Sequence, residues 1–398
     1  MPEAVKSTSW PRLLTRHGQP VRVAHLTTVD MSLALLLGTE LEFDVAAGLD
    51  TYGLSAPGPY VGRVEALGVT HIPLPALTRS WSPRGDLGAT RQLLAAVREL
   101  HPDVLHTHNP KTGVIGRLVG RAAGVPVIVN TCHGLWAGTG DRLRKRLAVY
   151  GAEVAAAVFS DAELYQNGVD RHTLRRFVRQ TKTRVVGNGT DLTRFHPDLE
   201  LRRRVRREWG VGPKDLLVGG VGRLVAEKGI VEFGKAAREL QGKALFVWVG
   251  PADPDKGDAL SLTDGAVRFV GERSDMPAVY NALDVFVLPS YREGFSRSAM
   301  EAAACGTAML LSDIRGCREI GAHGQEVLLV PPRDADVLRD ELSRLLDDGP
   351  LRERLANAAR QRAVGNFDQR RVAGLSLETY ATVAARKDLG WTVQRGAP

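Results

Sequence analysis

Cysteine is scarce in this chain, with Cys132, Cys305 and Cys317 the only three among 398 residues. They are widely spaced and form no C-x-x-C pair, which excludes a disulfide framework and a zinc site of the usual spacing. Long apolar runs are also missing: none approaches the ~20 residues that a membrane span requires, and no signal-peptide core follows Met1. We therefore expect a protein that stays in a reducing cytoplasm.

Aromatic residues make up only 6% of the chain, whereas its formal net charge is +8. An excess of positive charge favours anionic partners, which include nucleotide sugars, phospholipid surfaces and nucleic acids. The basic residues cluster in segments 142–146, 171–184 and 202–207, and such clusters are most often solvated helix faces. Nucleic-acid binding needs interleaved aromatic residues or a reading helix, and neither is evident. We therefore predict no nucleic-acid partner.

The length of the chain and its pattern of apolar runs predict two α/β domains. Short apolar runs alternate with helical patterns, as in doubly wound parallel sheets. The predicted strands are 21–26, 43–47, 70–72, 104–106, 125–131, 155–159, 183–186, 216–221, 244–249, 267–270, 284–288, 308–311 and 327–330. We predict a flexible arm over 1–20, a first domain over 21–195, a second over 196–367, and a final helix and tail over 368–398.

The segment from 284 to 319 carries the densest set of signals. Its apolar run, closed by Pro289, predicts a buried strand, and Ser296 can cap the helix that follows. A helix that begins beside a strand's carboxyl end directs free N–H groups toward the ligand crevice. Gly294, Phe295 and Ser296 are therefore predicted to cradle a phosphate.

Two glutamates belong to the same segment. Glu301 lies on the predicted helix, roughly 7 to 8 Å along its axis from the phosphate cradle at about 1.5 Å per residue. This is near the distance from a distal phosphate to the ribose of a nucleoside diphosphate, so Glu301 can hold ribose hydroxyls. Glu293 then faces the sugar.

Several motifs occur in one fixed order and together resemble a known family. The pattern E-G-F-x(5)-E-A-x-A-x-G, in which Glu293 and Glu301 are eight residues apart, resembles the E-x7-E signature of retaining glycosyltransferases of the GT-B fold, family 4 (glycosyl transferases group 1). The other matching segments are Gly222-Arg223-Leu224, Lys228-Gly229, Val186 to Asp191 with Phe195 and Pro197, and His106 to Lys111. The resemblance covers nearly the whole chain.

The resemblance implies two facing Rossmann-like domains, with a terminal helix that crosses back onto the first. It implies a hexosyltransferase that moves a sugar from a nucleotide-sugar donor, UDP-linked in our prediction, to a hydroxyl acceptor with retention of configuration and without a metal or other cofactor. The reaction follows a front-face path in which the departing phosphate oxygen takes the acceptor's proton. The family's glycine-rich loop after the first strand is absent, since residues 27–32 contain no glycine and offer hydroxyls instead.

Four residues are predicted to be catalytic. Arg223 and Lys228 are two cations on a loop that follows a strand, where they can stabilise the charge of a departing diphosphate. His133 follows the strand 125–131 and matches the family's histidine, which lies close to the donor sugar. Together with Glu293 it is predicted to orient that sugar.

No metal site is predicted. His106 and His108 form an H-x-H pair, but no third ligand is evident nearby, so we interpret them as strand-end residues that line the crevice. Asp253 and Asp255 form a D-x-D pair in a loop rich in proline and glycine, and the resemblance implies metal-independent catalysis.

Two other functions stay open: a GT-B-fold epimerase that acts on a nucleotide sugar, and a non-catalytic protein that binds one. The acceptor also stays open between a polyprenyl- or lipid-linked molecule and a soluble glycan or natural-product precursor. Segment 141–150 combines basic and apolar residues in a helical pattern, so an anionic membrane surface at the inner face of the membrane is one possible partner.

Overall fold

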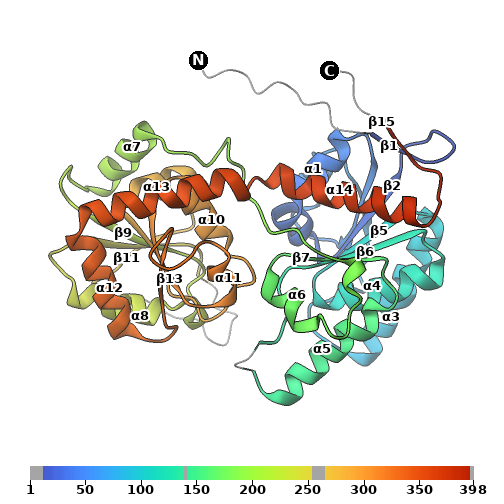
Figure 1. The fold of residues 1–398 in the computed structure, drawn as a ribbon, viewed down its shortest axis with the longest axis horizontal. Coiled ribbons are helices and arrows are strands. Elements are labelled where there is room, and N and C mark those ends of the chain that lie inside the picture. The colour runs from blue at the N-terminus through green and yellow to red at the C-terminus, as the bar shows by residue number, and fades with distance from the viewer. Residues whose placement is uncertain (1–11, 139–140, 253–264, 395–398) are drawn as a thin grey trace. The chain divides into compact units, whose positions relative to one another are not determined.

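The computed structural model describes residues 12–138, 141–252 and 265–394. Its contacts divide the chain into two compact units, shown in Figure 1: unit 1 comprises Met1–Gly187 and Arg370–Pro398, and unit 2 comprises Asn188–Gln369. The chain thus leaves unit 1 about eight residues before the predicted boundary at 195 and returns to it close to the predicted start of the final segment at 368.

Among the described residues, unit 1 contains a parallel sheet in the order β4-β3-β2-β5-β6-β7-β8. Its strands are β2 (Arg22–Val29), β3 (Asp50–Ala56), β4 (Thr70–Pro73), β5 (Val104–His108), β6 (Val127–Cys132), β7 (Ala162–Tyr165) and β8 (Thr183–Val185). Its α-helices are α1 (Gly38–Ala46), α2 (Val61–Glu65), α3 (Pro83–Leu100), α4 (Pro110–Ala123), α5 (Leu143–Ala157), α6 (Gly168–Leu174) and α14 (Gln369–Arg386).

Unit 2 contains a second parallel sheet, in the order β11-β10-β9-β12-β13-β14 over its described residues. The strands are β9 (Leu217–Val221), β10 (Leu245–Val249), β11 (Arg268–Gly271), β12 (Val285–Leu288), β13 (Ala308–Ser312) and β14 (Leu328–Val330). The helices are α7 (Leu199–Trp209), the short helix η3 (Ala226–Lys228), α8 (Ile230–Glu239), α9 (Met276–Ala282), α10 (Arg297–Ala304), α11 (Arg315–Arg318), α12 (Ala335–Asp347) and α13 (Gly349–Asn366).

Both sheets reverse their strand order at the same place. In each, the first long strand lies between the second and the fourth, so the order changes direction between β2 and β5 in unit 1 and between β9 and β12 in unit 2. Open α/β sheets bind ligands at the carboxyl ends of strands beside such a switch point. These two places are therefore where each unit is expected to hold functional side chains.

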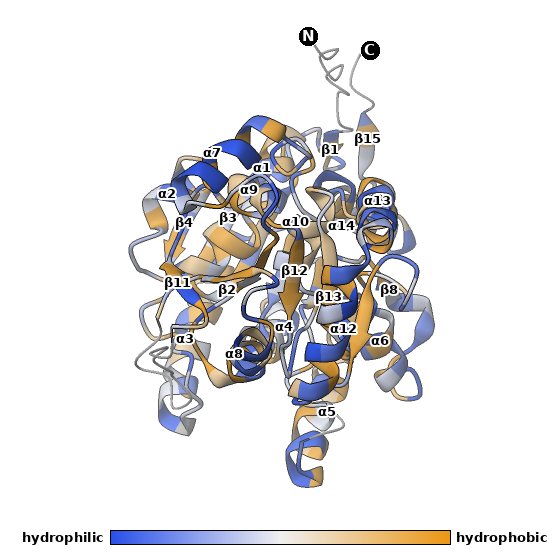
Figure 2. Ribbon diagram, turned by 90° about the vertical axis from the view of Figure 1, so that its left-hand side faces the viewer, coloured by the Kyte–Doolittle hydropathy of each residue, from blue (hydrophilic) through white to orange (hydrophobic). Residues whose placement is uncertain are grey.

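The burial pattern explains why these segments form strands and helices. Every residue of β12 is buried, as the apolar run predicts for a strand covered on both faces. Figure 2 shows this strand in the hydrophobic colour and α7 in the hydrophilic one. Charged α7 still buries Val205 and Trp209 on one side, which is how an amphipathic helix covers a sheet.

The predicted final helix is confirmed as α14, which packs against the sheet of unit 1 and not that of unit 2. Its residues Ala373, Leu377 and Tyr380 join the core cluster that contains Val23 and Val104, and Figure 1 shows the helix running past β2 and β5. The chain therefore returns from α13 of unit 2 to complete unit 1. This agrees with the crossover helix that the family resemblance implies.

Four local predictions are wrong. Segment 43–47 belongs to α1 rather than a strand, and segment 155–159 covers the end of α5, while the strands β3 and β7 lie further along the chain. Residues 12–14, placed in a flexible arm, form strand β1, which pairs antiparallel with β15 (Thr392–Gln394). In addition, the first predicted strand, 21–26, continues to Val29 as β2, so residues 27–29 are not part of the loop that follows it.

Candidate functional site

The switch point of unit 2 holds an ion pair between two of the predicted catalytic residues. Lys228 ends η3, on the loop after β9, and Glu293 lies on the loop after β12. The Lys228 Nζ atom lies 2.6 Å from Glu293 Oε1, and the two side chains are 20% and 13% exposed. The fold therefore brings together a cation and a carboxylate that are 65 residues apart in sequence, at the edge where ligands bind.

Close backbone contact holds these two loops together. Gly229 has φ +73, and a Cβ atom there would lie 2.0 Å from the carbonyl oxygen of Pro289. Next to this contact, the backbone N–H of Tyr291 donates to the carbonyl of Glu227 at 2.8 Å. The Lys228–Glu293 pair is thus fixed by a junction that only glycine permits.

Arg223 lies on the same loop as Lys228 but is more exposed. Its side chain is 45% exposed, and its Nη2 atom lies 3.5 Å from Glu227 Oε1, four residues further on. An exposed pair at this distance binds weakly, so a ligand anion can compete for the guanidinium.

The predicted phosphate cradle is positioned by the start of α10. The Ser296 hydroxyl accepts a hydrogen bond from the Ala299 N–H at 3.3 Å, which confirms that Ser296 caps this helix. Phe295 packs edge-on against Phe367, with 5.8 Å between ring centroids. Both side chains are therefore engaged within unit 2, and the backbone N–H groups of this segment are suited to a phosphate.

Glu301 is held by two neighbours. Its Oε2 accepts from the Tyr280 hydroxyl at 2.8 Å, and its Oε1 lies 3.4 Å from Arg297 Nε. Burial raises the pKa of Glu301, while Arg297 and Tyr280 oppose the rise. A carboxylate has about four lone-pair positions, so these contacts leave capacity for ligand hydroxyls.

Three polar groups of this edge were not predicted. Tyr280 is one, since nothing in the sequence connects it with Glu301. The other two are the hydroxyls of Ser290 and Ser312, which are buried without a hydrogen-bond partner in the part of the chain that the structure describes. Both serines lie where predicted strands end, and that position was the available signal.

In unit 1, His133 follows β6, at the carboxyl edge of the sheet. It is part of a row of hydrogen-bonded rings: His133 Nε2 lies 3.0 Å from His108 Nδ1, and His108 Nε2 lies 3.2 Å from His25 Nδ1. His25 Nε2 in turn lies 2.8 Å from Asp44 Oδ2. His133 and His108 were predicted to line the crevice, but His25 and Asp44 were not, because segment 43–47 was predicted to be a strand rather than the end of α1.

Burial keeps most of these rings neutral. It lowers the pKa of His133 to about 4 and holds the pKa values of His106 and His108 well below their usual value. Burial also lowers the pKa of His25, but the hydrogen bond and charge of Asp44 outweigh it, so that pKa is raised. Any proton that charges this cluster is therefore held at its Asp44–His25 end.

The cluster also has the composition of a metal site, since one nitrogen from each of His25, His106 and His108 lies within 4.8 Å of the others. However, both nitrogens of each ring have a hydrogen-bond partner. Those of His106 are Tyr380 Oη at 2.6 Å and Thr131 Oγ1 at 2.7 Å. Hydrogen bonding alone accounts for this arrangement, and metal independence stays a prediction. Asp253 and Asp255 lie outside the described residues.

Two of the hydroxyls predicted in segment 27–32 lie at the end of β2 and are engaged within unit 1. Thr27 Oγ1 donates to the carbonyl of Val29 at 3.0 Å, and Thr28 Oγ1 lies 3.4 Å from Thr112 Oγ1. Asp30 instead holds the loop that follows β3, because its carboxylate accepts from the Tyr60 N–H at 2.7 Å. The loop after β2 therefore contributes a carboxylate, Asp30, and contains no glycine.

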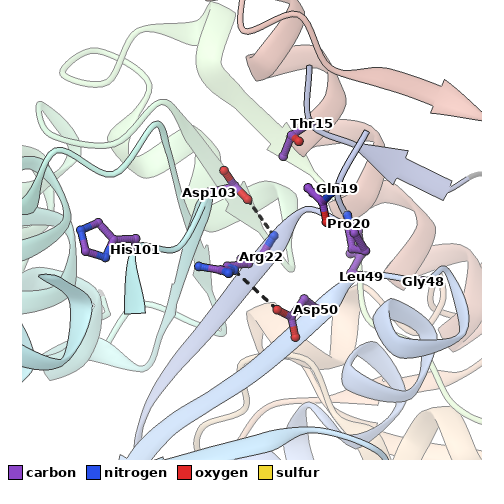
Figure 3. Close-up of a pocket in the computed structure, with 9 residues that line it drawn as sticks. All are labelled: Thr15, Gln19, Pro20, Arg22, Gly48, Leu49, Asp50, His101 and Asp103. Atoms are coloured by element: carbon purple, nitrogen blue, oxygen red, sulfur yellow. Dashed lines mark hydrogen bonds and ion pairs between the residues drawn. The ribbon is translucent and has the colours of Figure 1, made fainter. Parts of the chain in front are cut away.

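A cavity of unit 1 lies at the opposite edge of the sheet (Figure 3). Arg22 and Asp50 begin β2 and β3, and Asp103 directly precedes β5. The Arg22 N–H donates to Asp103 Oδ2 at 2.9 Å, and Arg22 Nε lies 3.6 Å from Asp50 Oδ2. Ligands of doubly wound sheets bind at the carboxyl ends of strands, so this cavity is not a candidate for the ligand site.

Two family models match the chain and together cover both units. The model described as "Glycosyl transferase 4-like domain" matches residues 12–189, and the one described as "Glycosyl transferases group 1" matches residues 202–362.

Among curated proteins, the chain is 31% identical over 384 residues to a D-inositol 3-phosphate glycosyltransferase of Salinispora arenicola, covering 86% of this chain and 84% of that protein. It is 28% identical over 335 residues to the N,N'-diacetylbacillosaminyl-diphospho-undecaprenol alpha-1,3-N-acetylgalactosaminyltransferase of Campylobacter jejuni, covering 81% of this chain and 89% of that protein.

Solved structures share the fold at lower sequence identity. A crystal structure of Anabaena HepE in complex with UDP superposes with a TM-score of 0.76 at 19% identity, covering 91% of this chain and all of that one. A sucrose-phosphate synthase from Thermosynechococcus elongatus gives a TM-score of 0.76 at 22% identity, covering 92% of this chain and all of that one. Among the helices of the described residues, none is long and apolar enough to cross a membrane.

Proposed function

Because the chain belongs to the group 1 glycosyltransferases, we propose that unit 2 binds a UDP-linked sugar and that the enzyme transfers this sugar with retention of configuration. It is a glycosyltransferase that moves a sugar from a nucleotide-sugar donor to a hydroxyl acceptor. Beyond this activity, we propose that UDP is the leaving group, that the configuration is retained, and that individual residues have the roles given below.

The observation that carries the proposal is the Lys228–Glu293 pair at the β9/β12 switch point. An ammonium has three donors, so Lys228 can keep Glu293 as a partner and still donate to a diphosphate oxygen. Arg223, on the same loop, supplies a second cation. As the glycosidic bond breaks, negative charge grows on the diphosphate, and two fixed cations stabilise that charge without a metal.

The remaining groups of unit 2 bind the rest of the donor. Backbone N–H groups at the start of α10, around Gly294, Phe295 and Ser296, bind a phosphate, and Glu301 accepts hydrogen bonds from the ribose hydroxyls. Glu293 and His133 orient the sugar, and the departing phosphate oxygen takes the acceptor's proton. Tyr280 supports this arrangement, because its hydroxyl fixes the carboxylate of Glu301.

Isothermal titration calorimetry with UDP tests the binding roles. Arg223→Ala and Glu301→Ala should each weaken UDP binding about 10- to 150-fold, since a charge-assisted hydrogen bond contributes about 1.5 to 3 kcal/mol. Arg203→Ala, at an exposed position on α7, is the matched control and should leave the affinity unchanged. Unchanged affinity in both site variants would contradict the assignment.

Product analysis separates transfer from its alternatives. With a UDP-sugar, release of UDP that depends on an acceptor indicates transfer. A changed sugar without release would indicate an epimerase, and neither product would indicate a protein that only binds the nucleotide sugar.

A second proposal concerns the acceptor and rests on α5. Leu143 and Leu147, one helical turn apart, are 65% and 64% exposed, and Arg142 and Arg144 beside them are also exposed. Trp136, 46% exposed, lies 5.3 Å from Lys145 Nζ and extends this surface. We propose that this basic and apolar surface contacts anionic lipid headgroups, so that a cytoplasmic enzyme meets a lipid-linked acceptor at the inner face of the membrane.

Co-sedimentation with phosphatidylglycerol vesicles tests the membrane contact. Binding should fall with salt and with Arg142→Glu/Arg144→Glu, because each cation contributes about 1 kcal/mol near an anionic surface. Arg203→Glu/Arg207→Glu on α7 makes the same charge change elsewhere and should bind like the unaltered protein. No vesicle binding at low salt, or an equal loss of vesicle binding in both double variants, would contradict the membrane contact and favour a soluble acceptor.

A further inference from the structure

Four side chains of unit 1 form one unbranched row of hydrogen bonds. It runs from Asp44 on α1 through His25 on β2 and His108 on β5 to His133 after β6, with contacts of 2.8, 3.2 and 3.0 Å. The side chains of Asp44, His25 and His108 have no exposed surface. At the far end, His133 Nδ1 is buried and has no hydrogen-bond partner among the described residues.

The bonds between the three rings have only two consistent arrangements of their protons. A neutral imidazole carries one N–H, so one nitrogen donates and the other accepts. If Asp44 is ionised and accepts from His25 Nε2–H, then His25 Nδ1 must accept from His108 Nε2–H. His108 Nδ1 must likewise accept from His133 Nε2–H, which leaves a lone pair on His133 Nδ1.

One additional proton on the Asp44–His25 pair reverses both bonds between the rings. His25 then donates through Nδ1 to His108, and His108 donates through Nδ1 to His133 Nε2, so the proton of His133 resides on Nδ1. This result is the same whether the added proton is on the carboxyl group or on the ring. The end atom of the row therefore reports the protonation of a pair that lies two rings away.

We propose that Asp44, His25 and His108 are positioning residues that set the proton on His133 Nδ1 and make this atom a hydrogen-bond donor to an oxygen of the bound nucleotide sugar. The inference rests on the proposed function, in which His133 contacts the donor. It adds that the protonation of the Asp44–His25 pair, at the β2/β5 switch point, determines whether His133 Nδ1 donates or accepts this hydrogen bond.

The groups around the row favour the protonated pair near neutral pH. Glu40 on α1, with its Oε1 3.5 Å from His106 Nδ1, adds a second carboxyl group near His25. Further groups on this side are His106 on β5, Thr131 on β6, and Ser376 and Tyr380 on α14. Burial keeps His106, His108 and His133 from taking the charge, whereas the pKa of His25 is raised above 6.5.

Histidine tautomers measured by nitrogen-15 NMR test the proposal on the whole chain labelled at histidine. Long-range proton–nitrogen spectra distinguish Nδ1–H from Nε2–H in each ring. We expect His133 to carry Nδ1–H at neutral pH and to change to Nε2–H at a pH above 6.5, with the same midpoint as the titration of His25.

Two variants of neighbouring rings on β5 provide the contrast. His108→Phe removes the link, so His25 should still titrate while His133 no longer follows it. His106→Phe makes the same change at an equally buried ring outside the row, so the shared midpoint should persist. The proposal would be overturned if the His133 tautomer did not change with pH in the unaltered protein. It would also be overturned if, in His108→Phe, the tautomer still changed with the same midpoint as the titration of His25.

Asp44→Asn serves if His108→Phe does not fold. Removing the negative charge should move the His133 change to lower pH by about one to three pH units, and an unmoved midpoint would contradict the row. Elemental analysis that finds one stoichiometric metal ion, lost in His25→Phe, would also overturn it. These readouts need no nucleotide sugar, so failure of the proposed donor binding by UDP titration is distinguishable from failure of the row.

Discussion

The two switch points have the same strand order but opposite chemistry. At β9/β12 the facing groups are a charged pair, Lys228 and Glu293, each partly exposed. At β2/β5 the facing groups are His25 and His108, which are fully buried, and His25 is also hydrogen-bonded to Asp44. Topology alone therefore fixes where functional side chains gather, and the residues at that place decide what they can bind.

The proposed function assigns a different task to each switch point. A diphosphate carries full charges, which exposed cations can bind and release as the reaction proceeds. A sugar is neutral and offers hydroxyl groups, and these are recognised by hydrogen bonds of fixed direction in a dry surrounding. The charged switch point suits the leaving group, and the neutral one suits a single directed hydrogen bond.

Acidification should produce the largest difference in stability between the two units. The pKa values of buried His106, His108 and His133 are lowered, so the folded state binds fewer protons than the unfolded state below pH 6.5, and stability falls as the pH falls. Each ring loses about 1.4 kcal/mol per pH unit in this range. Native-state hydrogen exchange at pH 7.5 and 5.5 should show a larger loss of protection in β5 and β6 than in β12 and β13.

His25 acts in the opposite direction, because its raised pKa contributes stability that is fully present below pH 6.5 and is lost as the pH rises through its folded value. Burial also raises the pKa values of Glu40 and Asp44, which therefore act in the same direction as His25, and a variant that lacks one lowered ring isolates the contribution of that ring. His106→Phe should reduce the acid sensitivity of unit 1 by about 1.4 kcal/mol per pH unit. Equal loss of protection in both units would contradict the contrast.

The charged switch point should be more sensitive to backbone change. Gly229→Ala places a Cβ where the Pro289 carbonyl oxygen already lies, at a residue with φ +73. We expect a loss of about 3 kcal/mol, from strain and overpacking together, which lowers the thermal midpoint by several degrees. Gly234→Ala on α8, where a Cβ meets nothing within 4 Å, is the control and should be neutral or stabilising. Equal thermal midpoints of Gly229→Ala and Gly234→Ala would mean that the backbone contact between Gly229 and Pro289 is not rigid.

The sequence predicted the elements whose burial follows simple patterns. The continuous apolar run of β12 and the capped start of α10 are examples, because both depend on neighbours along the chain. Prediction failed for residues that are buried because they contact a partner distant in sequence. Glu163 could not be recognised inside buried β7, since its partner Arg117, 2.8 Å away, lies 46 residues earlier.

The same limit applies to the site. Arg223, Lys228, Glu293 and Ser296 occupy the ends of predicted strands or helices, which sequence alone can locate. The link from His25 to Asp44 requires knowing that α1 is a helix and that it packs beside β2. The elements could therefore be predicted from the sequence, but the interactions between them could not.

Neutralising each partner of the charged pair should have opposite effects on UDP binding. Lys228→Met removes a donor and should weaken binding about 10-fold or more. Glu293→Gln removes the carboxylate that competes for Lys228, so UDP affinity should stay equal or rise while sugar transfer falls. Calorimetry with UDP measures the first effect, and UDP release from a UDP-sugar with acceptor measures the second. Parallel weakening in both variants would show that the pair acts only as a structural bridge.

Chelation should have the smallest effect, because the proposed function uses no metal at either switch point. In that proposal, Arg223 and Lys228 of unit 2 supply the positive charge that a divalent ion would otherwise bring to the diphosphate. In unit 1, the ring nitrogens of His25, His106 and His108 are already hydrogen-bonded. UDP affinity and UDP release should therefore be unchanged by excess EDTA. EDTA saturated with magnesium controls for binding of the chelator's own negative charge to the basic site. Activity that is lost with free EDTA alone and restored by manganese or magnesium would make a metal part of one of the two sites.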